Sequence, residues 1–265
     1  MTLNELANGL IKMANSRGIL YTLKFIVLDI YANRLSFPIN GHTKELMFWE
    51  KQASGIGSIS KKYSEKINPE KQQASFPKEI LPYIENQHKR LSRIPRVLDV
   101  GSGPVSLLAF GHKNKLIELT ATDILANDYK NLLNVYGHSS AMEGIDMINS
   151  TAEDLPVTFS NKRFDIIYCN NALDHTDSPK ASLSAMSEIV DTGGYIIISG
   201  RQREGTKEGW DGIHMHDLFL KDNILYREGK NEAPVRLDEN LPLEIVYSND
   251  SQNNFNDMII VYAKT

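Results

Sequence analysis

The spacing of apolar residues divides the chain into two parts with different periodicities. In residues 1–93, apolar positions recur at helical intervals, which predicts helices at about 3–15, 18–35, 43–53 and 77–91. The stretch 55–60, Gly-Ile-Gly-Ser-Ile-Ser, is expected to be a flexible loop, and the polar stretch 64–75 an irregular connection. We therefore expect an N-terminal helical cap over residues 1–93.

From residue 94 onwards, short apolar runs alternate with helical or polar segments. Strands are predicted at 96–100, 118–122, 145–150, 164–169 and 194–199, a pattern typical of a parallel sheet with crossover helices. Two more runs, 243–247 and 258–263, are joined by a loop alone, which predicts an antiparallel pair. We expect residues 94–265 to form an α/β core with an insertion at about 201–240, in which 224–227 and 234–237 form a small hairpin.

Composition and charge narrow the classes of partner. The chain has 265 residues, of which 41% are hydrophobic and 23% charged, as in ordinary soluble proteins. The 29 basic and 33 acidic residues give a net charge of −4, so no basic surface for nucleic acid is expected. The oligomeric state stays open.

Targeting signals and the redox compartment point to the cytoplasm. The single cysteine, Cys169, excludes an internal disulfide and fits a reducing compartment, and the N-terminus lacks the order of a signal peptide. The apolar run 18–32 contains Lys24 and Asp29 and is too short to cross a bilayer. We expect this run to be a packed helix without membrane contact.

The stretch Val97-Leu98-Asp99-Val100-Gly101-Ser102-Gly103-Pro104 is the most informative part of the sequence. An apolar strand runs into a glycine turn, where backbone turns sharply or a ligand approaches closely. Asp99 would repel a phosphate and would accept from a cationic or hydroxyl-rich ligand. Ser106 replaces the third glycine of the dinucleotide fingerprint, which argues against a nicotinamide cofactor.

Residues 97–103 resemble motif I of class I S-adenosylmethionine (SAM)-dependent methyltransferases. The segments 120–123, 150–156, 164–175 and 193–200 follow in the order of that family, so the resemblance covers about residues 94–200. It implies a Rossmann-like, seven-stranded, mostly parallel sheet with an antiparallel final strand, and SAM as the cofactor.

The resemblance also implies a set of cofactor-binding residues. Asp99 would lie near the amino group of SAM, and Asp123 would hold the ribose hydroxyls. The other expected cofactor-binding residues are Gly101, Ser102, Gly103, Ile124, Ala152, Glu153, Asp154, Asn170 and Asn171. Alternatively, Asp123 caps a helix or a turn, and Glu153 and Asp154 begin a solvated helix. Asp165 is expected to stabilise the loop before its strand.

His175 is the first candidate for catalysis, because it follows the fourth predicted strand of the core, where an acceptor would meet the donor methyl group. A histidine at this place would take the proton of an attacking hydroxyl. Asp174 would orient the imidazole ring or act as the base itself. The alternative is that both residues only shape the loop.

A second cluster of candidate residues lies in the insertion, at 209–217. In an extended segment His214 and His216 share one face, and Trp210 offers a flat surface for a sugar. We expect these three residues, with Tyr63 from a lid, to contact the substrate. No metal site is assigned, although the two histidines could form one with Asp174 or His175.

The combined prediction is methyl transfer from SAM to an oxygen of a small polar acceptor. Segment 45–50, with the Asp174-His175 pair and the insertion, resembles a bacterial group of methyltransferases linked to surface polysaccharide, which implies a sugar or nucleotide-sugar hydroxyl. The alternatives are a methyltransferase for another small metabolite, a nicotinamide-dependent oxidoreductase, or a binding module without catalysis.

Overall fold

A computed structural model describes residues 2–34, 40–210, 213–250 and 257–265. The first part of the chain is helical, as expected, and contains α1 (Leu3–Arg17), α2 (Ile19–Arg34), α3 (Gly41–Ser54), α4 (Ser60–Ile67) and α5 (Leu81–Leu91). The prediction of an irregular connection was wrong for α4. Tyr63 and Ile67, four residues apart, point one face of this short helix into the core, and flanking polar residues hide that period in the sequence.

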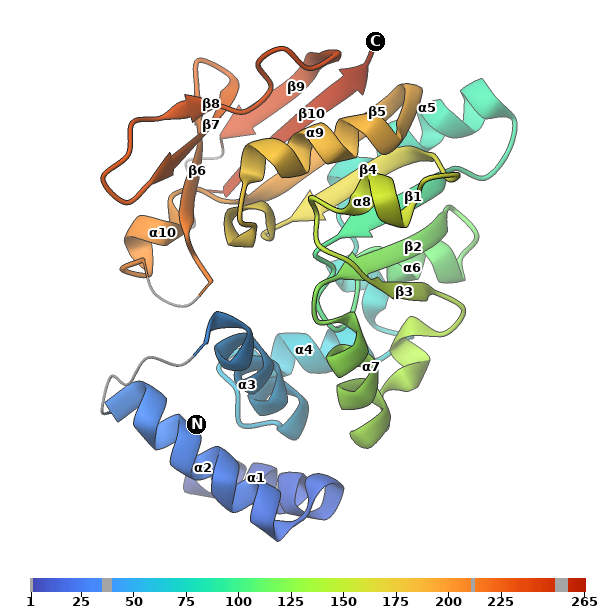
Figure 1. Cartoon of the computed structure of the whole chain (residues 1–265). Helices are drawn as coiled ribbons and strands as arrows, with labels where there is room; N and C mark the ends of the chain where they lie inside the picture. Colours follow the sequence, from blue (N-terminus) through green and yellow to red (C-terminus); the bar gives the residue numbers. More distant parts are fainter. Residues whose placement is uncertain (1, 35–39, 211–212, 251–256) are drawn as a thin grey trace.

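The main sheet has seven strands in the order β3-β2-β1-β4-β5-β10-β9 (Figure 1). The first five in chain order are parallel, and β10 runs antiparallel to both β5 and β9. Their bounds are β1 (Arg96–Val100), β2 (Glu118–Asp123), β3 (Asp146–Asn149), β4 (Phe164–Asn170), β5 (Val190–Arg201), β9 (Leu243–Asp250) and β10 (Asp257–Lys264). The predicted fold class is confirmed.

Both faces of this sheet are buried, because successive side chains of a strand point in opposite directions. Val97 and Ile166 pack with Ile84 of α5 on one face. Leu98 and Ile167 pack on the other face with residues of α9 (Pro179–Ile189). The remaining crossover helices are α6 (Ala109–Lys113), α7 (Ala126–Val135) and α8 (Leu155–Thr158). This two-sided burial explains why the strands of the core read as continuous apolar runs.

The insertion forms a second, three-stranded antiparallel sheet, β6 (His216–Lys221), β7 (Ile224–Gly229) and β8 (Val235–Arg236), after the short helix α10 (Glu204–Lys207). The hairpin predicted from its last two strands is confirmed. The first strand was missed because it begins with polar residues. Asp217 is buried there, and its carboxylate accepts from the amide and hydroxyl of Thr206 at 2.8 and 2.5 Å.

A buried carboxylate joins the N-terminal helices to the core. Glu50 on α3 is 4% exposed and accepts two hydrogen bonds from Arg17 of α1, each 3.2 Å long. The hydroxyl of Tyr136, just after α7, donates to the same carboxylate at 2.6 Å. Lys12 adds a bond of 2.8 Å to the carbonyl of Ala53. These contacts hold α1 and α3 against the core.

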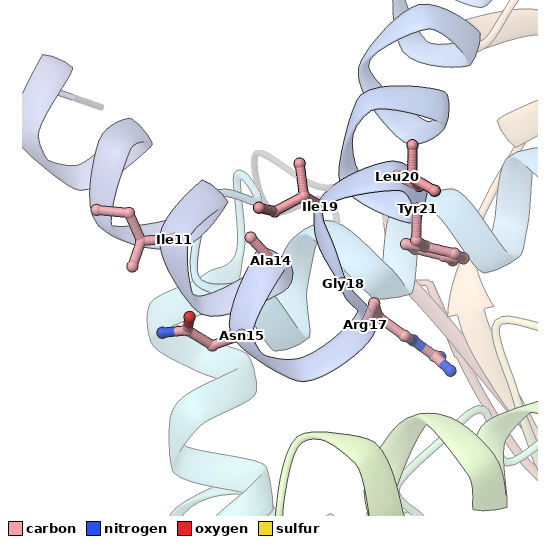
Figure 2. Close-up of a pocket in the computed structure, with 8 residues that line it drawn as sticks. All are labelled: Ile11, Ala14, Asn15, Arg17, Gly18, Ile19, Leu20 and Tyr21. Atoms are coloured by element: carbon pink, nitrogen blue, oxygen red, sulfur yellow. The ribbon is translucent and has the colours of Figure 1, made fainter.

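An open groove of about 720 Å³ lies between α1 and α2, away from the main sheet (Figures 1 and 2). Apolar residues such as Ile11, Ile19 and Leu20 line it, and none of the residues expected at the cofactor or acceptor site is among them. Within the described residues, every helix is too short or too polar to cross a membrane.

Asp165 fixes the start of β4 against β1. Its carboxylate is fully buried and accepts from both terminal nitrogens of Arg93, at 2.7 and 2.8 Å, and from the amide of Arg96 at 2.6 Å. A bidentate guanidinium pair of this kind is strong and directional. The structural role expected for Asp165 agrees with these contacts.

Replacement of Arg93 tests this arrangement. Arg93→Ala leaves the buried Asp165 carboxylate without its bidentate partner, so we expect the free energy of unfolding to fall by about 3 kcal/mol. Lys180→Ala is the matched control, because its pair with Glu239 at 3.4 Å is exposed and should contribute less than about 1 kcal/mol. Urea unfolding measures both variants, and equal losses would contradict the role of Asp165.

Candidate functional site

The glycine turn after β1 has no room for a side chain at Gly101, and both of its glycines have a left-handed φ. The amides of Gly101 and Ser102 donate to the carbonyl of Thr122 at 2.8 and 3.1 Å, which ties the turn to β2. Gly101 has φ +68°, and a Cβ there would lie 2.3 Å from the Cβ of Ala172 after β4. Gly103 has φ +62° and lies under the ring of Trp49. Both positions need glycine, and the turn leaves bare backbone facing α3.

Asp99 is buried directly beneath this turn. It is 3% exposed, and the hydroxyl of Ser106 donates to its carboxylate at 2.5 Å. Burial raises the pKa of Asp99 to about 7, and the nearby carboxylate of Asp123 acts in the same direction. The ammonium of Lys66 on α4 opposes this shift, and burial in turn lowers the pKa of Lys66.

Asp123 ends β2, as expected, and its carboxylate holds the turn in place. One oxygen accepts from the amide of Gly103 at 3.0 Å and the other from the amide of Leu125 at 2.9 Å. Burial raises its pKa, and the neighbouring carboxylate of Glu45 adds to the shift. The next residue, Ile124, has an exposed side chain. Asp123 therefore holds the turn, and it can also accept from the hydroxyls of a ribose, because each carboxylate oxygen keeps a free lone pair.

Three side chains from the N-terminal helices lie near the glycine turn, although the sequence did not predict them as cofactor-binding residues: Glu45, Trp49 and Lys66. Glu45 of α3 accepts from the indole nitrogen of Trp49 at 2.6 Å, which orients the ring over Gly103. Lys66 of α4 faces Asp99 electrostatically. Nothing in the local sequence places these residues near the turn, because the contact depends on how the helices pack.

The expected adenine-lining residues all have local partners. Glu153 accepts from the amide of Ser178 at 3.0 Å, and Asp154 accepts from the hydroxyl of Thr151 at 2.8 Å. Ala152 is buried between them and the core. Their assignment to adenine stays a prediction.

Asn170 and Asn171 lie at the end of β4, beside the end of β5. The side-chain oxygen of Asn170 accepts from the hydroxyl of Ser199 at 2.9 Å. Asn171 has φ +54°, and its side-chain oxygen accepts from the amide of Arg201 at 2.9 Å. These bonds fix the direction in which the chain leaves β4 towards Asp174.

The next turn of chain brings Asp174 and His175 together with His214 of the insertion. Oδ2 of Asp174 lies 2.9 Å from Nδ1 of His214 and 3.2 Å from Nε2 of His175, and the two nitrogens are 3.1 Å apart. Burial acts to raise the pKa of Asp174, but its contacts with both histidines outweigh this and hold the pKa well below its usual range. We call these three residues the Asp-His-His cluster.

The other expected substrate residues lie outside the Asp-His-His cluster. His216 begins β6, and neither nitrogen of its buried ring has a partner within the described part of the chain. Trp210, with φ +60°, packs against Gly205 of α10, and the two residues after it lie outside the described residues. Tyr63 is 1% exposed and packs beside Trp49, so it is buried in α4 and not on an exposed lid.

Comparison with known proteins agrees with the sheet and the glycine turn. Residues 98–198 match the family model described as a methyltransferase domain. This part of the chain is thus similar to a methyltransferase domain, and the strand order of the sheet agrees with that similarity. The cofactor is SAM, as the resemblance of the glycine turn implied. A search of curated proteins gave no significant match.

Several solved methyltransferase structures resemble the chain. One is the 1,6-didemethyltoxoflavin-N1-methyltransferase of Burkholderia thailandensis, with 19% identity, TM-score 0.44, and coverage of 69% of this chain and 77% of that chain. Another is an amino pentose methyltransferase from Micromonospora echinaspora, with 14% identity, TM-score 0.45, and coverage of 71% and 90%. A third is an N-methyltransferase of Bradyrhizobium japonicum, with 14% identity, TM-score 0.42, and coverage of 69% and 88%. Similarity at this level does not identify an acceptor.

The residues around the turn fit SAM. The carboxylates of Asp99, Asp123 and Glu45 gather where a cofactor with an ammonium and a sulfonium group would lie, and hydroxyl groups of a ribose suit the free lone pairs of Asp123. At Gly103 no side chain separates the backbone from Trp49. The buried hydroxyl of Tyr63 has no partner among the described residues and is free to bind a polar group.

The raised pKa of Asp99 makes the stability of the free protein depend on pH. Between about pH 4 and pH 8 the folded protein holds this proton more tightly than the unfolded chain, so the free energy of unfolding falls as pH rises. Asp99→Asn removes this fall in the free energy of unfolding. Across this pH range, we expect the free energy of unfolding of the variant to rise relative to that of the wild type by at most about 4 kcal/mol.

Urea unfolding at several pH values, without cofactor, measures the effect. Asp146→Asn is the control, because Asp146 is exposed at the start of β3. Parallel pH profiles for wild type and Asp99→Asn would show that Asp99 is not the buried titrating group.

Proposed function

We propose that the chain transfers the methyl group of SAM to an oxygen of a small polar acceptor, with a sugar or nucleotide-sugar hydroxyl as the acceptor class. The observation that carries this proposal is the place of the Asp-His-His cluster. It follows β4 directly, and Ala172, two residues before Asp174, lies against Gly101 of the cofactor turn. An acceptor held at the cluster would thus lie beside the cofactor.

SAM supplies an electrophilic methyl group, and the protein positions the acceptor. Most of the rate gain in such a displacement comes from holding the attacking oxygen in line with the methyl, about 3 Å away. The backbone at Gly101 and Gly103 admits the cofactor, while Trp49 covers the turn and excludes water. The Asp-His-His cluster binds the acceptor hydroxyl. It also stabilises the positive charge that develops on the hydroxyl oxygen during attack, until the proton leaves. That His175 itself takes this proton remains a prediction.

The substrate side of the site would be completed by the insertion. His214 supports this assignment because it crosses from the insertion to the cluster. We keep Trp210 and His216 as proposed acceptor contacts, since both belong to the segment that carries His214. For Tyr63 we propose contact with the cofactor, because it packs beside Trp49, the residue over Gly103.

A product analysis tests the acceptor class. We expect ¹³C-methyl-labelled SAM, with a panel of nucleotide sugars and amino sugars, to give O-methyl signals in the NMR spectrum. The chemical shift separates O-methyl from N-methyl products. Labelling of amines alone would overturn oxygen transfer while leaving the methyltransferase assignment in place.

Replacement of His175 tests the role of the cluster. His175→Gln should lower kcat by about 10²–10⁴-fold, because the acceptor hydroxyl loses its activating group. The affinity for S-adenosylhomocysteine, measured by calorimetry, should stay within about threefold of the wild type. His88→Gln is the control, since His88 is exposed on α5. An unchanged kcat in His175→Gln would place the acceptor elsewhere.

A further inference from the structure

The three short contacts of the Asp-His-His cluster cannot all be hydrogen bonds. Each ring nitrogen carries either a proton or a lone pair. If both nitrogens carry protons, two N–H groups face each other across 3.1 Å. If a nitrogen carries a lone pair, that lone pair faces the carboxylate oxygen at 2.9 or 3.2 Å. No protonation state of the three groups satisfies all three contacts at once.

A bound cation resolves this conflict, because the carboxylate oxygen and the two ring nitrogens can then each direct a lone pair at the same ion. Ligand atoms about 2.1 Å from a transition-metal ion are about 3.0 Å apart at the right angles of an octahedral site and about 3.4 Å apart at tetrahedral angles. The observed separations of 2.9, 3.1 and 3.2 Å are nearer to the right-angle value. We infer that Oδ2 of Asp174, Nε2 of His175 and Nδ1 of His214 bind a divalent metal ion.

The donor set indicates the class of metal. Two imidazoles and one carboxylate on one face suit zinc, iron, cobalt or manganese, whereas magnesium and calcium prefer oxygen ligands alone. Asp174 is buried, but the side chains of both histidines are 23% exposed. The remaining coordination positions are therefore open on the histidine side, as in catalytic rather than structural metal sites.

The surroundings of the cluster favour a positive charge. Glu204 of α10 is 4% exposed; its Oε1 accepts from Arg201 at 3.4 Å, and its Oε2 has no hydrogen-bond partner among the described residues. Its carboxylate acts electrostatically on His214, and so does that of Glu208. Arg201 offsets part of this buried negative charge, and a cation at the Asp-His-His cluster would offset more of it.

The catalytic meaning of the site rests on the proposed function, although the metal site itself does not. An ion with open positions beside the cofactor turn would hold the acceptor oxygen and lower the pKa of its hydroxyl. In that state His175 is a ligand and not the base that its place in the sequence suggests. The sequence assigned no metal site and left open whether a metal is needed, so this site would be an addition to the sequence-based prediction.

Equilibrium dialysis of the chelator-treated full chain against zinc, with elemental analysis, tests the inference. We expect one zinc ion per chain in the wild type and in His88→Gln. His214→Gln should weaken binding at least 100-fold, because loss of an outer partner alone costs 10- to 100-fold. Asp174→Asn provides a second variant in case His214→Gln does not fold. Magnesium should not compete with zinc.

Two outcomes would overturn the metal site. One is zinc binding no stronger in the wild type than in a folded His214→Gln or Asp174→Asn variant, and the other is the absence of stoichiometric binding. Calorimetry with S-adenosylhomocysteine on the same samples shows whether each variant is folded and binds the cofactor product. Failure of the wild type to bind it would contradict the proposed function and leave the zinc measurement valid on its own.

Discussion

The site depends on a close backbone approach between the ends of β1, β2 and β4. Gly101 lies so near Ala172 that a side chain at this position would overlap it, and its amide is bound to the end of β2. This packing forces the chain to leave β1 in a left-handed turn. It also places the loop after β4, which carries Asp174, next to the glycine turn proposed to receive the cofactor. The proposed cofactor site and the proposed acceptor site are therefore neighbours because of one steric constraint.

Charge complements this constraint. The turn is surrounded by the carboxylates of Asp99, Asp123 and Glu45, and Lys66 opposes the charge of Asp99. Such a site repels phosphate and favours a cofactor that carries positive charge. The neighbouring Asp-His-His cluster also contains a negative charge, the buried carboxylate of Asp174. The two regions thus attract positive groups of different kinds.

The sequence alone predicted much of the core, because both faces of the sheet are buried and its strands are continuous apolar runs. The glycine turn, Asp123 and the pair Asp174-His175 follow directly from their positions at strand ends. By contrast, α4 escaped prediction because polar residues surround its two buried ones, Tyr63 and Ile67. The first strand of the insertion was missed because it begins with polar residues, and the hydrogen bonds from Thr206 and the ion pair with Arg203 that allow Asp217 to be buried there leave no periodicity in the sequence.

The candidate site was only partly predictable for the same reason. His214 was proposed for the acceptor side, but its short contact with Asp174 depends on how the insertion folds back over β4. Glu45 and Trp49 reach the turn from a helix about fifty residues earlier in the chain. Contacts between distant segments leave no local pattern, whereas strand ends do.

The bonds of Glu50 limit how far this protein can be shortened. The family match begins at residue 98, and a chain cut just before α3 would still contain every strand of the main sheet. It would nevertheless lose Arg17, and of the three hydrogen bonds described for the Glu50 carboxylate only the one from Tyr136 would remain. A buried charge without its counter-ion destabilises the element that carries it. That element is α3, which holds Trp49 over the glycine turn, so the first helix supports this turn through α3.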